Sequence, residues 1–395
     1  MNISYKWLLE YLPCTLSPQE IADTLTSIGL ETGGVEEIET IRGGLRGLVI
    51  GHVLTCEEHP NSDHLHITTV DVGADAPLQI VCGAPNVAAG QKVVVATVGT
   101  TLYHGEEEFA IKKSKIRGVE SFGMICSEVE IGVGSSNDGT IVLLSDAPVG
   151  MPAAEYYHVE SDYCIEVDIT PNRVDATSHY GVARDLAASL KRNGVPAELK
   201  LPEVNLPTDI IDSRIEVKVA DATACPRYQG LVIRDITVGE SPEWLRNRLQ
   251  AIGLRPINNI VDITNYVLHE FGQPLHAFDL AFIKEDRVHV QTVAEGTPFV
   301  TLDGVERKLT AEDLMICDSN GDPMCVAGVF GGLHSGVTEK TKDIFLESAN
   351  FNPTMVRRTA RRLGLNTDSS FRFERGLDPE RTDWALRRAA SLILE

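Results

Sequence analysis

The stretch from about residue 40 to 150 most constrains the fold, because short runs of apolar and β-branched residues alternate there with Gly, Pro and Asn. Four such runs are LVIGHVL (48–54), HITTVDV (66–72), QIVCGAP (79–85) and KVVVATV (92–98). Short, closely spaced strands of this kind are typical of a small barrel or sandwich. Because helical patterns precede and follow the stretch, we predict that it is inserted into a small N-terminal domain.

The helical pattern ahead of this stretch begins with a clear start signal. Ser17 is placed to cap a helix, Pro18 suits the first helical position, and Glu20 completes a capping box. Apolar residues at helical spacing continue to Gly29, where we expect the helix to end. The same start and end signals recur at Ser241-Pro242 and Gly253, but shared capping chemistry explains them without an internal repeat.

The rest of the chain divides into a helix, a linker and a mixed domain. A helical pattern covers 172–190, and the prolines that follow it predict a linker: Pro196, Pro202 and Pro207. Beyond the linker, 215–220 and 287–293 alternate as half-buried strands among helical patterns. We therefore predict an α+β domain over roughly 210–395, and 395 residues agree with two or three domains.

The charge excludes one class of protein. The chain carries 35 Lys and Arg against 57 Asp and Glu, a net charge of −22. Such a chain does not coat nucleic acid indiscriminately, because that binding depends on neutralising phosphates. Local basic patches can still hold a nucleic acid, since a partner responds to the field at its own contacts.

The compartment follows from what the sequence lacks. No run of 18 apolar residues is present, and the start of the chain is not that of a secretory signal. Eight scattered cysteines without a C-x-x-C pair predict free thiols in a reducing compartment, so we expect a cytoplasmic protein. The histidines at 52, 59, 64 and 66 match no usual zinc spacing, and we expect no metal.

Two basic clusters each allow a structural interpretation and a functional one. One consists of Lys112, Lys113, Lys115 and Arg117, which predict either a solvated edge strand or a phosphate-contacting rim of a barrel. Charge alone favours the solvated strand. The other lies in 351–395, where nine arginines face six acids and four arginines fall within 357–362. Arginine suits phosphate, although an arginine-rich helix is more often structural.

The residues best suited to chemistry lie in 255–280 and 325–375. Glu347 stands in an apolar run, so we expect either a core salt bridge with an arginine or a specificity carboxylate in a pocket. His276 alone is more often a satisfied core histidine than a catalytic one. No P-loop lysine, Gly-x-Ser-x-Gly elbow or nucleophilic cysteine signature is present, so any hydrolysis would use water as nucleophile.

Taken in order, several strings resemble the bacterial phenylalanyl-tRNA synthetase beta subunit along essentially the whole chain. They are MNISYKWL (1–8), HPNSDHL (59–65), VCGAPN (81–86), DITPNR (168–173), TNY (264–266) and QPLHAFD (273–279). The resemblance implies an α+β multidomain fold. We expect a small N-terminal domain (1–39 and 152–195), an inserted OB-fold barrel that binds tRNA (40–151), a linker (196–210) and an α+β editing domain (211–395).

The resemblance also implies an editing pocket that hydrolyses tyrosine wrongly esterified to phenylalanine tRNA. Matching motifs carry over the catalytic positions as His276, Glu347, Thr264 and Asn265. The pocket positions carry over as Arg255, Pro274, Gly328, Gly331, Thr367 and Ser369. Glu347 is expected to accept the tyrosine hydroxyl, and Ser369 departs from the alanine that the resemblance leads us to expect.

The physical reason for such a site is that a hydrophobic pocket cannot strongly reject an isostere that adds a hydroxyl. The family's catalytic-like domain is expected to be missing, so this stretch should not charge tRNA itself. The implied partners are tRNA(Phe) and the alpha subunit of a heterotetramer. No cofactor is expected in this stretch, whereas ATP and Mg belong to the holoenzyme.

Two other functions remain open. One is a non-catalytic tRNA-binding or assembly module. The other is a class II aminoacylation core, suggested by F-R-F-E (371–374), although no glycine-rich third motif follows it.

Overall fold

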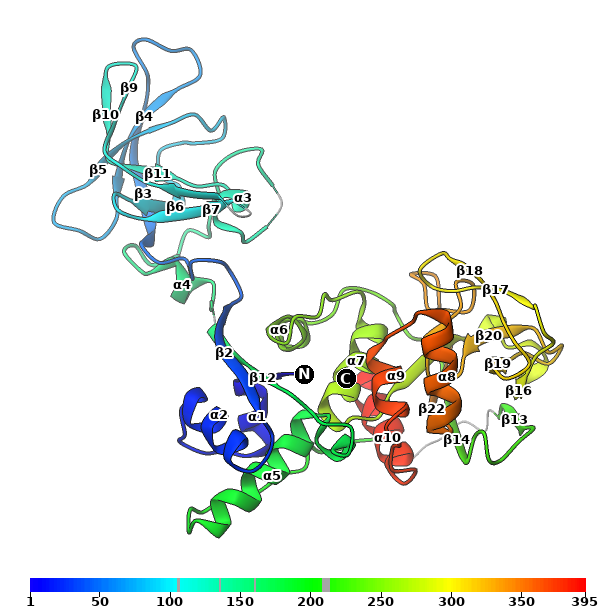
Figure 1. Cartoon of the computed structure of the whole chain (residues 1–395). Helices are drawn as coiled ribbons and strands as arrows, with labels where there is room; N and C mark the ends of the chain where they lie inside the picture. Colours follow the sequence, from blue (N-terminus) through cyan, green and yellow to red (C-terminus); the bar gives the residue numbers. More distant parts are fainter. Residues whose placement is uncertain (105–106, 135, 160, 208–213) are drawn as a thin grey trace. The chain divides into compact units, whose positions relative to one another are not determined.

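The computed structural model describes residues 1–104, 107–134, 136–159, 161–207 and 214–395. The chain forms two compact units, one of Met1–Glu36 with Tyr163–Glu395 and one of Glu37–Asp162 (Figure 1). The finer division into an N-terminal domain, a linker and an editing domain stays a prediction. Residues 208–210 of that linker and 211–213 of that domain lie outside the described residues.

The unit Glu37–Asp162 is built on a five-stranded sheet with the order β11-β6-β3-β4-β5. Its strands are β3 (Leu48–Glu58), β4 (His66–Asp71), β5 (Leu78–Cys82), β6 (Lys92–Thr97) and β11 (Gly123–Ile125). The backbone N–H of Phe122, beside β11, donates to Gln79 O of β5 at 2.9 Å, which links the two edges of the sheet. The four strand runs expected from the sequence are thus confirmed, as is the small barrel.

Two hairpins and two short helices complete this unit. The hairpins pair β7 (Thr101–His104) with β8 (Glu107–Ala110), and β9 (Ser114–Ile116) with β10 (Val119–Ser121). The helices are α3 (Glu128–Ile131) and α4 (Ala153–Tyr156). Buried apolar residues form two clusters in this unit, one with Ile50 and Val94 and the other with Val53 and Val93.

The other unit begins with a small sheet, β1-β12-β2, formed by β1 (Asn2–Ser4), β12 (Ser161–Val167) and β2 (Thr32–Glu39). Its helices are α1 (Tyr5–Tyr11), α2 (Pro18–Ser27) and α5 (His179–Arg192). Ser17 and Glu20 form the expected capping box of α2. The helix expected over 172–190 begins only at His179, because a 3₁₀ turn, η1 (Val174–Ala176), precedes it.

A central three-stranded sheet, β14-β22-β15, organises the remainder of this unit. It consists of β14 (Arg227–Ile233), β22 (Ile344–Asn350) and β15 (Leu275–Asp279). One face packs in the apolar core that also contains side chains of α6 (Glu243–Ala251), α7 (Asn259–Phe271) and α10 (Arg381–Leu394). The 3₁₀ turns η2 (Leu280–Phe282) and η3 (Lys284–Asp286) follow β15.

The opposite face of β14-β22-β15 packs in a second core. A five-stranded sheet contributes to it, formed by β13 (Glu216–Val219), β16 (Arg287–Thr292), β19 (Leu314–Cys317), β20 (Pro323–Val326) and β21 (Phe330–Gly331). The hairpin β17 (Pro298–Val300) and β18 (Glu306–Lys308), with helices α8 (Pro353–Leu363) and α9 (Asp368–Phe373), completes this side. The expected strands 215–220 and 287–293 are confirmed as β13 and β16, which pair in parallel.

Three smaller observations complete the fold. Ser241, expected to start a helix as Ser17 does, does not cap α6; Pro242 holds that position, and the Ser241 hydroxyl donates to the Asp262 carboxylate instead. All eight cysteines carry free thiols, as expected. Within the described ranges, no helix is both long and apolar enough to span a bilayer.

Candidate functional site

The candidate site is a row of residues across the central sheet. Glu347, in the middle of the fully buried strand β22, lies opposite Gly230 of β14 and His276 of β15. Residues directly opposite each other in antiparallel strands point their side chains to the same face. Glu347 and His276 are therefore neighbours, with Cβ atoms roughly 4.5–5.5 Å apart. The structure thus places side by side two residues that the sequence resemblance assigned to one pocket.

The row and the adjoining Tyr228 contain three buried polar atoms that lack partners. Glu347 Oε2, His276 Nε2 and the Tyr228 hydroxyl have no hydrogen-bond partner within the described part of the chain. Glu347 is only 5% exposed and forms no ion pair with any described residue, so the expected alternative of a core salt bridge is wrong. A buried polar group without a partner costs about 1–3 kcal/mol. A fold retains such groups where a ligand or water supplies the missing partner.

Burial determines the protonation state of both ionisable residues in this row. It raises the pKa of Glu347 to about 8, and the neighbouring Tyr228 hydroxyl opposes this shift. Burial lowers the pKa of His276 to about 4. At neutral pH the carboxyl of Glu347 is therefore mostly protonated and the imidazole of His276 is neutral.

The glycine-rich segment 327–337 meets this row at Gly331. A Cβ atom on Gly331 would come within 2.9 Å of His276 Cε1 and of Leu302 Cδ1, so no larger residue fits there without displacing them. Gly328 has another role: its φ is +68°, and a Cβ atom would come within 2.9 Å of Phe373 Cδ2. Gly331 therefore touches the site, whereas Gly328 packs against the apolar core.

Thr367 connects α9 to the glycine-rich segment. Its hydroxyl donates to Val329 O at 2.8 Å and accepts the N–H of Ser370 at 3.0 Å, which caps α9. Ser369 lies half-buried in the first turn of α9. Pro274 precedes β15 and is buried.

The remaining predicted site residues lie on α7 and the loop before it. Thr264 is buried in α7 and donates its hydroxyl to Val261 O at 2.7 Å, and Asn265 follows it. Arg255 is exposed in the loop between α6 and α7. Among the described residues, no hydrogen bond or ion pair connects these three to Glu347 or His276.

Sequence reasoning missed two neighbours of the row. Tyr228 belongs to the run RYQGLVI (227–233), whose alternation indicates a strand but not which strand it meets. Leu302 is 46% exposed, and its backbone N–H donates to Gly331 O at 3.0 Å. A leucine exposed beside a turn gives no sequence signal, so only the fold identifies it.

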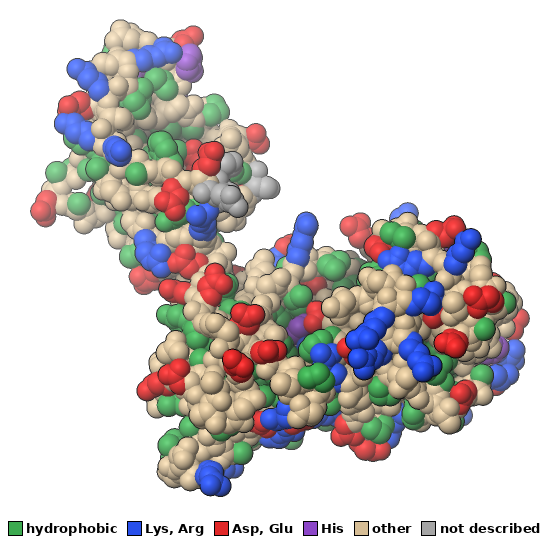
Figure 2. All heavy atoms as spheres, in the orientation of Figure 1, with side chains coloured by type: hydrophobic (Ala, Val, Ile, Leu, Met, Phe, Trp, Pro, Cys, Tyr) green, Lys and Arg blue, Asp and Glu red, His purple; other side chains and the backbone are tan. Residues whose placement is uncertain are grey.

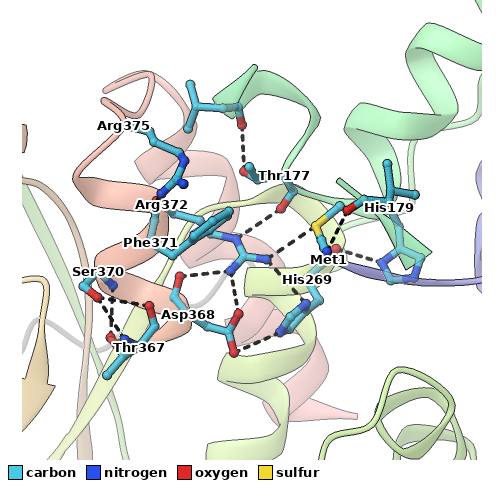
Figure 3. Close-up of polar contacts among 12 residues, drawn as sticks. Met1, Thr177, His179, His269, Thr367, Asp368, Ser370, Phe371, Arg372 and Arg375 are labelled. Atoms are coloured by element: carbon cyan, nitrogen blue, oxygen red, sulfur yellow. Dashed lines mark hydrogen bonds and ion pairs between the residues drawn. The ribbon is translucent and has the colours of Figure 1, made fainter. Parts of the chain in front are cut away.

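The F-R-F-E element (371–374) serves a structural purpose in this fold (Figure 3). Arg372 is 1% exposed; Nε donates to Thr177 O, and Nη1 donates to Asp368 O and Oδ1. Nη2 contacts His269 Nδ1 and Met1 Sδ. A guanidinium has five N–H donors, and these contacts direct all five at protein atoms.

The basic cluster of the barrel unit is exposed at and before the β9-β10 hairpin. Lys113 pairs with Glu120 at 2.9 Å, and Arg117 Nη1 donates to Asn61 O at 3.1 Å. Lys112 and Lys115 form no ion pair with the described residues. Lys112 also lines a cavity of about 830 Å³ together with the segment 81–85.

The histidines of this unit include one with a structural role. Backbone groups occupy both ring nitrogens of His59: Ile116 O lies 3.2 Å from Nε2, and the Asn61 N–H donates to Nδ1 at 3.1 Å. No cluster of three potential metal-ligating side chains occurs within the described residues.

Comparison with known families and proteins agrees with this architecture. Residues 48–152 match the family described as "Putative tRNA binding domain", and residues 224–395 match the "B3/4 domain". The whole chain is 99% identical to 48% of the phenylalanine–tRNA ligase beta subunit of Porphyromonas gingivalis. It is 66% identical to 48% of that of Bacteroides fragilis.

A solved fragment of the Pyrococcus horikoshii phenylalanyl-tRNA synthetase beta subunit covers 52% of this chain, which in turn covers 62% of the fragment. Its identity of 17% and TM-score of 0.29 are too low to bear on function. The chain spans about half the length of the curated relatives that it matches. Its whole length aligns with them at high identity, and both domain matches fall within it, so this chain belongs to the family of phenylalanine–tRNA ligase beta subunits.

Proposed function

We propose that this chain edits mischarged tRNA(Phe), hydrolysing the ester between tyrosine and the tRNA with water as the nucleophile. The observation that carries this proposal is the row of unpartnered, buried polar atoms on Tyr228, Glu347 and His276. A phenol and a water molecule are the kinds of partner that these atoms lack. The bound tRNA and the alpha subunit, with its ATP and Mg, belong to the same proposal, as does a cytoplasmic location.

Glu347 would select tyrosine by hydrogen bonding rather than by charge. Since its pKa is about 8, the carboxyl in the free protein is mostly neutral, and its carbonyl oxygen can accept the phenolic hydrogen. Phenylalanine would leave the carboxyl as unpaired as it is without substrate. A gained hydrogen bond and a satisfied buried group together favour tyrosine by about 1–3 kcal/mol, or roughly 5- to 150-fold.

His276 is better suited to orient a water molecule than to remove its proton. With a pKa of about 4, its imidazole is a weak base at neutral pH, well below the matched pKa of an efficient general base. Its buried Nε2 still offers a directed hydrogen-bonding group next to Glu347. Backbone N–H groups of the Gly331 segment are the nearest candidates to stabilise the oxyanion.

The site is closed in its present form, because Glu347 is 5% exposed and the three polar atoms are buried. The Leu302 side chain lies beside Gly331, which in turn lies beside His276, and Leu302 is itself partly exposed. Substrate entry therefore requires side chains such as that of Leu302 to move. We assign Thr264, Asn265 and Arg255 to contacts with the ester or the terminal nucleotide.

The alternatives have less support. A class II aminoacylation core would need the Arg372 side chain for substrate, whereas its donors are all engaged by protein atoms. A purely tRNA-binding module would not explain why three buried polar atoms in one row lack partners. Binding of tRNA by the barrel unit, through Lys112 and Lys115 in particular, fits within the editing proposal.

The test is loss of the ester from tyrosyl- and phenylalanyl-tRNA(Phe) incubated with the chain, alone and with a phenylalanine–tRNA ligase alpha subunit and full-length beta subunit added. We expect tyrosine to be released and phenylalanine to be retained. Glu347→Ala should lose most of the preference, and His276→Ala should slow release without unfolding the chain. Equal rates for the two esters in the unmodified chain would contradict the proposal. ATP–pyrophosphate exchange by the chain alone would instead support an aminoacylation core.

A further inference from the structure

Helix α8 carries an exposed surface of four arginines that the proposed site does not use. Arg357, Arg358, Arg361 and Arg362 are all exposed, whereas Val356 and Ala360 of the same helix are buried in the second core. Between Pro353 and Leu363 the helix contains no acidic residue. Figure 2 shows Lys and Arg side chains gathered over the region of α8. We call these four residues the α8 arginine surface.

Three of the four guanidinium groups are not neutralised by the protein. Arg362 pairs with the Asp313 carboxylate and donates to Lys308 O at 3.2 Å. Arg357, Arg358 and Arg361 form no ion pair among the described residues. In a chain with a net charge of −22, a cluster of uncompensated arginines is a local reversal of the overall field.

The helix dipole explains only part of this cluster. Cations in the last turn of a helix are stabilised by about 0.3–1 kcal/mol, which accounts for Arg361 and Arg362. Arg357 and Arg358 lie in the middle of α8, where the dipole gives no such benefit. Their presence next to the other two therefore requires another reason.

A cavity beside the surface has the chemistry of an anion site. It has a volume of about 270 Å³, and Arg358, Arg362, Thr310 and Thr359 are among its lining residues. Its two acids differ: Asp313 accepts from Arg362 and from the Thr359 hydroxyl, so its charge is compensated, while Glu312 is exposed. The free guanidinium of Arg358 can thus offer its planar fork to a phosphate.

The surface belongs to the same elements as the candidate site. α8 begins three residues after β22 ends, and β22 carries Glu347. The following helix, α9, is bound to the glycine-rich segment through the hydrogen bond from Thr367 to Val329 O. A nucleic acid held on α8 would therefore be held at a set position relative to Glu347 and His276.

We propose that the α8 arginine surface binds the phosphate backbone of the tRNA whose esterified end is hydrolysed at Glu347 and His276. This inference rests on the proposed editing function. The contacts are to backbone phosphates, so they contribute affinity and position rather than sequence recognition.

The test compares two double variants of the 395-residue chain, Arg357→Gln with Arg358→Gln and, as control, Lys191→Gln with Arg192→Gln. Both remove two adjacent, exposed cations from a helix of the same unit, and none of the four residues forms an ion pair with the described residues. Equal thermal unfolding of the two variants verifies that the fold is retained. The affinity for tRNA(Phe) is measured between about 50 and 200 mM salt.

We expect the α8 variant to bind tRNA roughly tenfold more weakly and its salt slope to fall by about 2, because each lost phosphate contact removes about 1. The control should change neither quantity. In deacylation, the α8 variant should raise KM for tyrosyl-tRNA about tenfold and leave kcat unchanged, while the tyrosyl ester of adenosine, which lacks the backbone, is hydrolysed at the unmodified rate.

Two results would overturn the inference: an unchanged affinity and salt slope in the α8 variant, or an equal loss in the control. The first would leave the surface to an acidic protein partner. Failure of the editing proposal is a separate result, since the unmodified chain would then hydrolyse neither ester, and the binding comparison would still decide whether α8 contacts tRNA.

Discussion

Two buried polar clusters in the same unit are built in opposite ways. Around Arg372, every donor of the guanidinium meets a protein atom, and the contacts join α9 to α7 and to the start of the chain. Across the central sheet, Glu347, His276 and Tyr228 each keep a buried polar atom without a partner. A satisfied cluster stabilises the fold, whereas an unsatisfied one costs stability and is suited to bind something from outside.

The largest effect is expected from breaking the satisfied cluster. Arg372→Ala would leave the buried Thr177 carbonyl without its donor and create a large void, while the exposed Asp368 carboxylate would turn to water. Because truncating a large buried side chain costs about 3–5 kcal/mol, we expect a correspondingly lower free energy of unfolding in urea titration. A loss below about 1 kcal/mol would show that the cluster around Arg372 contributes little to the stability of the fold.

Glu347→Gln should act in the opposite direction, stabilising the fold increasingly as pH rises above about 4.5. The folded-state pKa of about 8 lies above the ordinary value of 4.5, so the folded chain holds a proton that the unfolded chain releases between these values. The stability of the unmodified chain therefore falls as pH rises from about 4.5 to 8, by roughly 4 kcal/mol. Glutamine removes this dependence, so the variant gains on the unmodified chain up to about pH 8. Parallel stability curves would contradict the buried, neutral carboxyl.

His276→Gln sharpens the comparison at acidic pH. The folded-state pKa of about 4 lies below the ordinary 6.5, so the unfolded chain binds a proton that the folded chain refuses. The contribution of neutral His276 is present above about pH 6.5 and is lost as pH falls toward 4, at a cost of roughly 3 kcal/mol. Thermal unfolding at pH 7 and pH 4.5 should show a smaller acid loss for the variant. An equal loss in both would contradict the assigned burial.

Tyr228→Phe should have the smallest effect on stability. It removes a buried hydroxyl that has no partner, so we expect a change within about 1 kcal/mol, neutral or stabilising. The same change removes the group that opposes the rise in the pKa of Glu347, so the midpoint of the pH dependence should move upward. A strongly destabilised variant would mean that the hydroxyl has a structural partner after all.

Features with a local cause were predictable from the sequence. The capping box of Ser17 and Glu20 depends on residues three positions apart, and the four strand runs of the barrel depend on alternation and on turn residues between them. Longer-range competition defeated the same reasoning at Ser241, whose hydroxyl bonds to Asp262 instead of capping α6. Likewise, the helix expected from residue 172 begins at His179 because a 3₁₀ turn takes the first residues.

The site divides in the same way. Glu347, His276 and Gly331 were named from sequence motifs, and the fold brings these three together, while it leaves Gly328 in the apolar core and Arg255 exposed. Nothing in the motif F-R-F-E indicated that the Arg372 guanidinium would direct all its donors at Met1, Thr177, His269 and Asp368. Asp368 lies only four residues before Arg372, but Met1, Thr177 and His269 are far away in sequence, so no local pattern contains those three.

The element types, the barrel, the mixed domain and the resemblance to the family could all be inferred from the amino-acid order alone. Those properties depend on periodicity, caps and ordered motifs, all of which are visible in the sequence without the fold. Three properties follow only from the folded structure: Glu347 has no arginine partner, Tyr228 lies close to it, and burial keeps its carboxyl protonated at neutral pH. Those properties depend on which strands become neighbours and on how much water is excluded between them, and both are set by the packing of the whole unit.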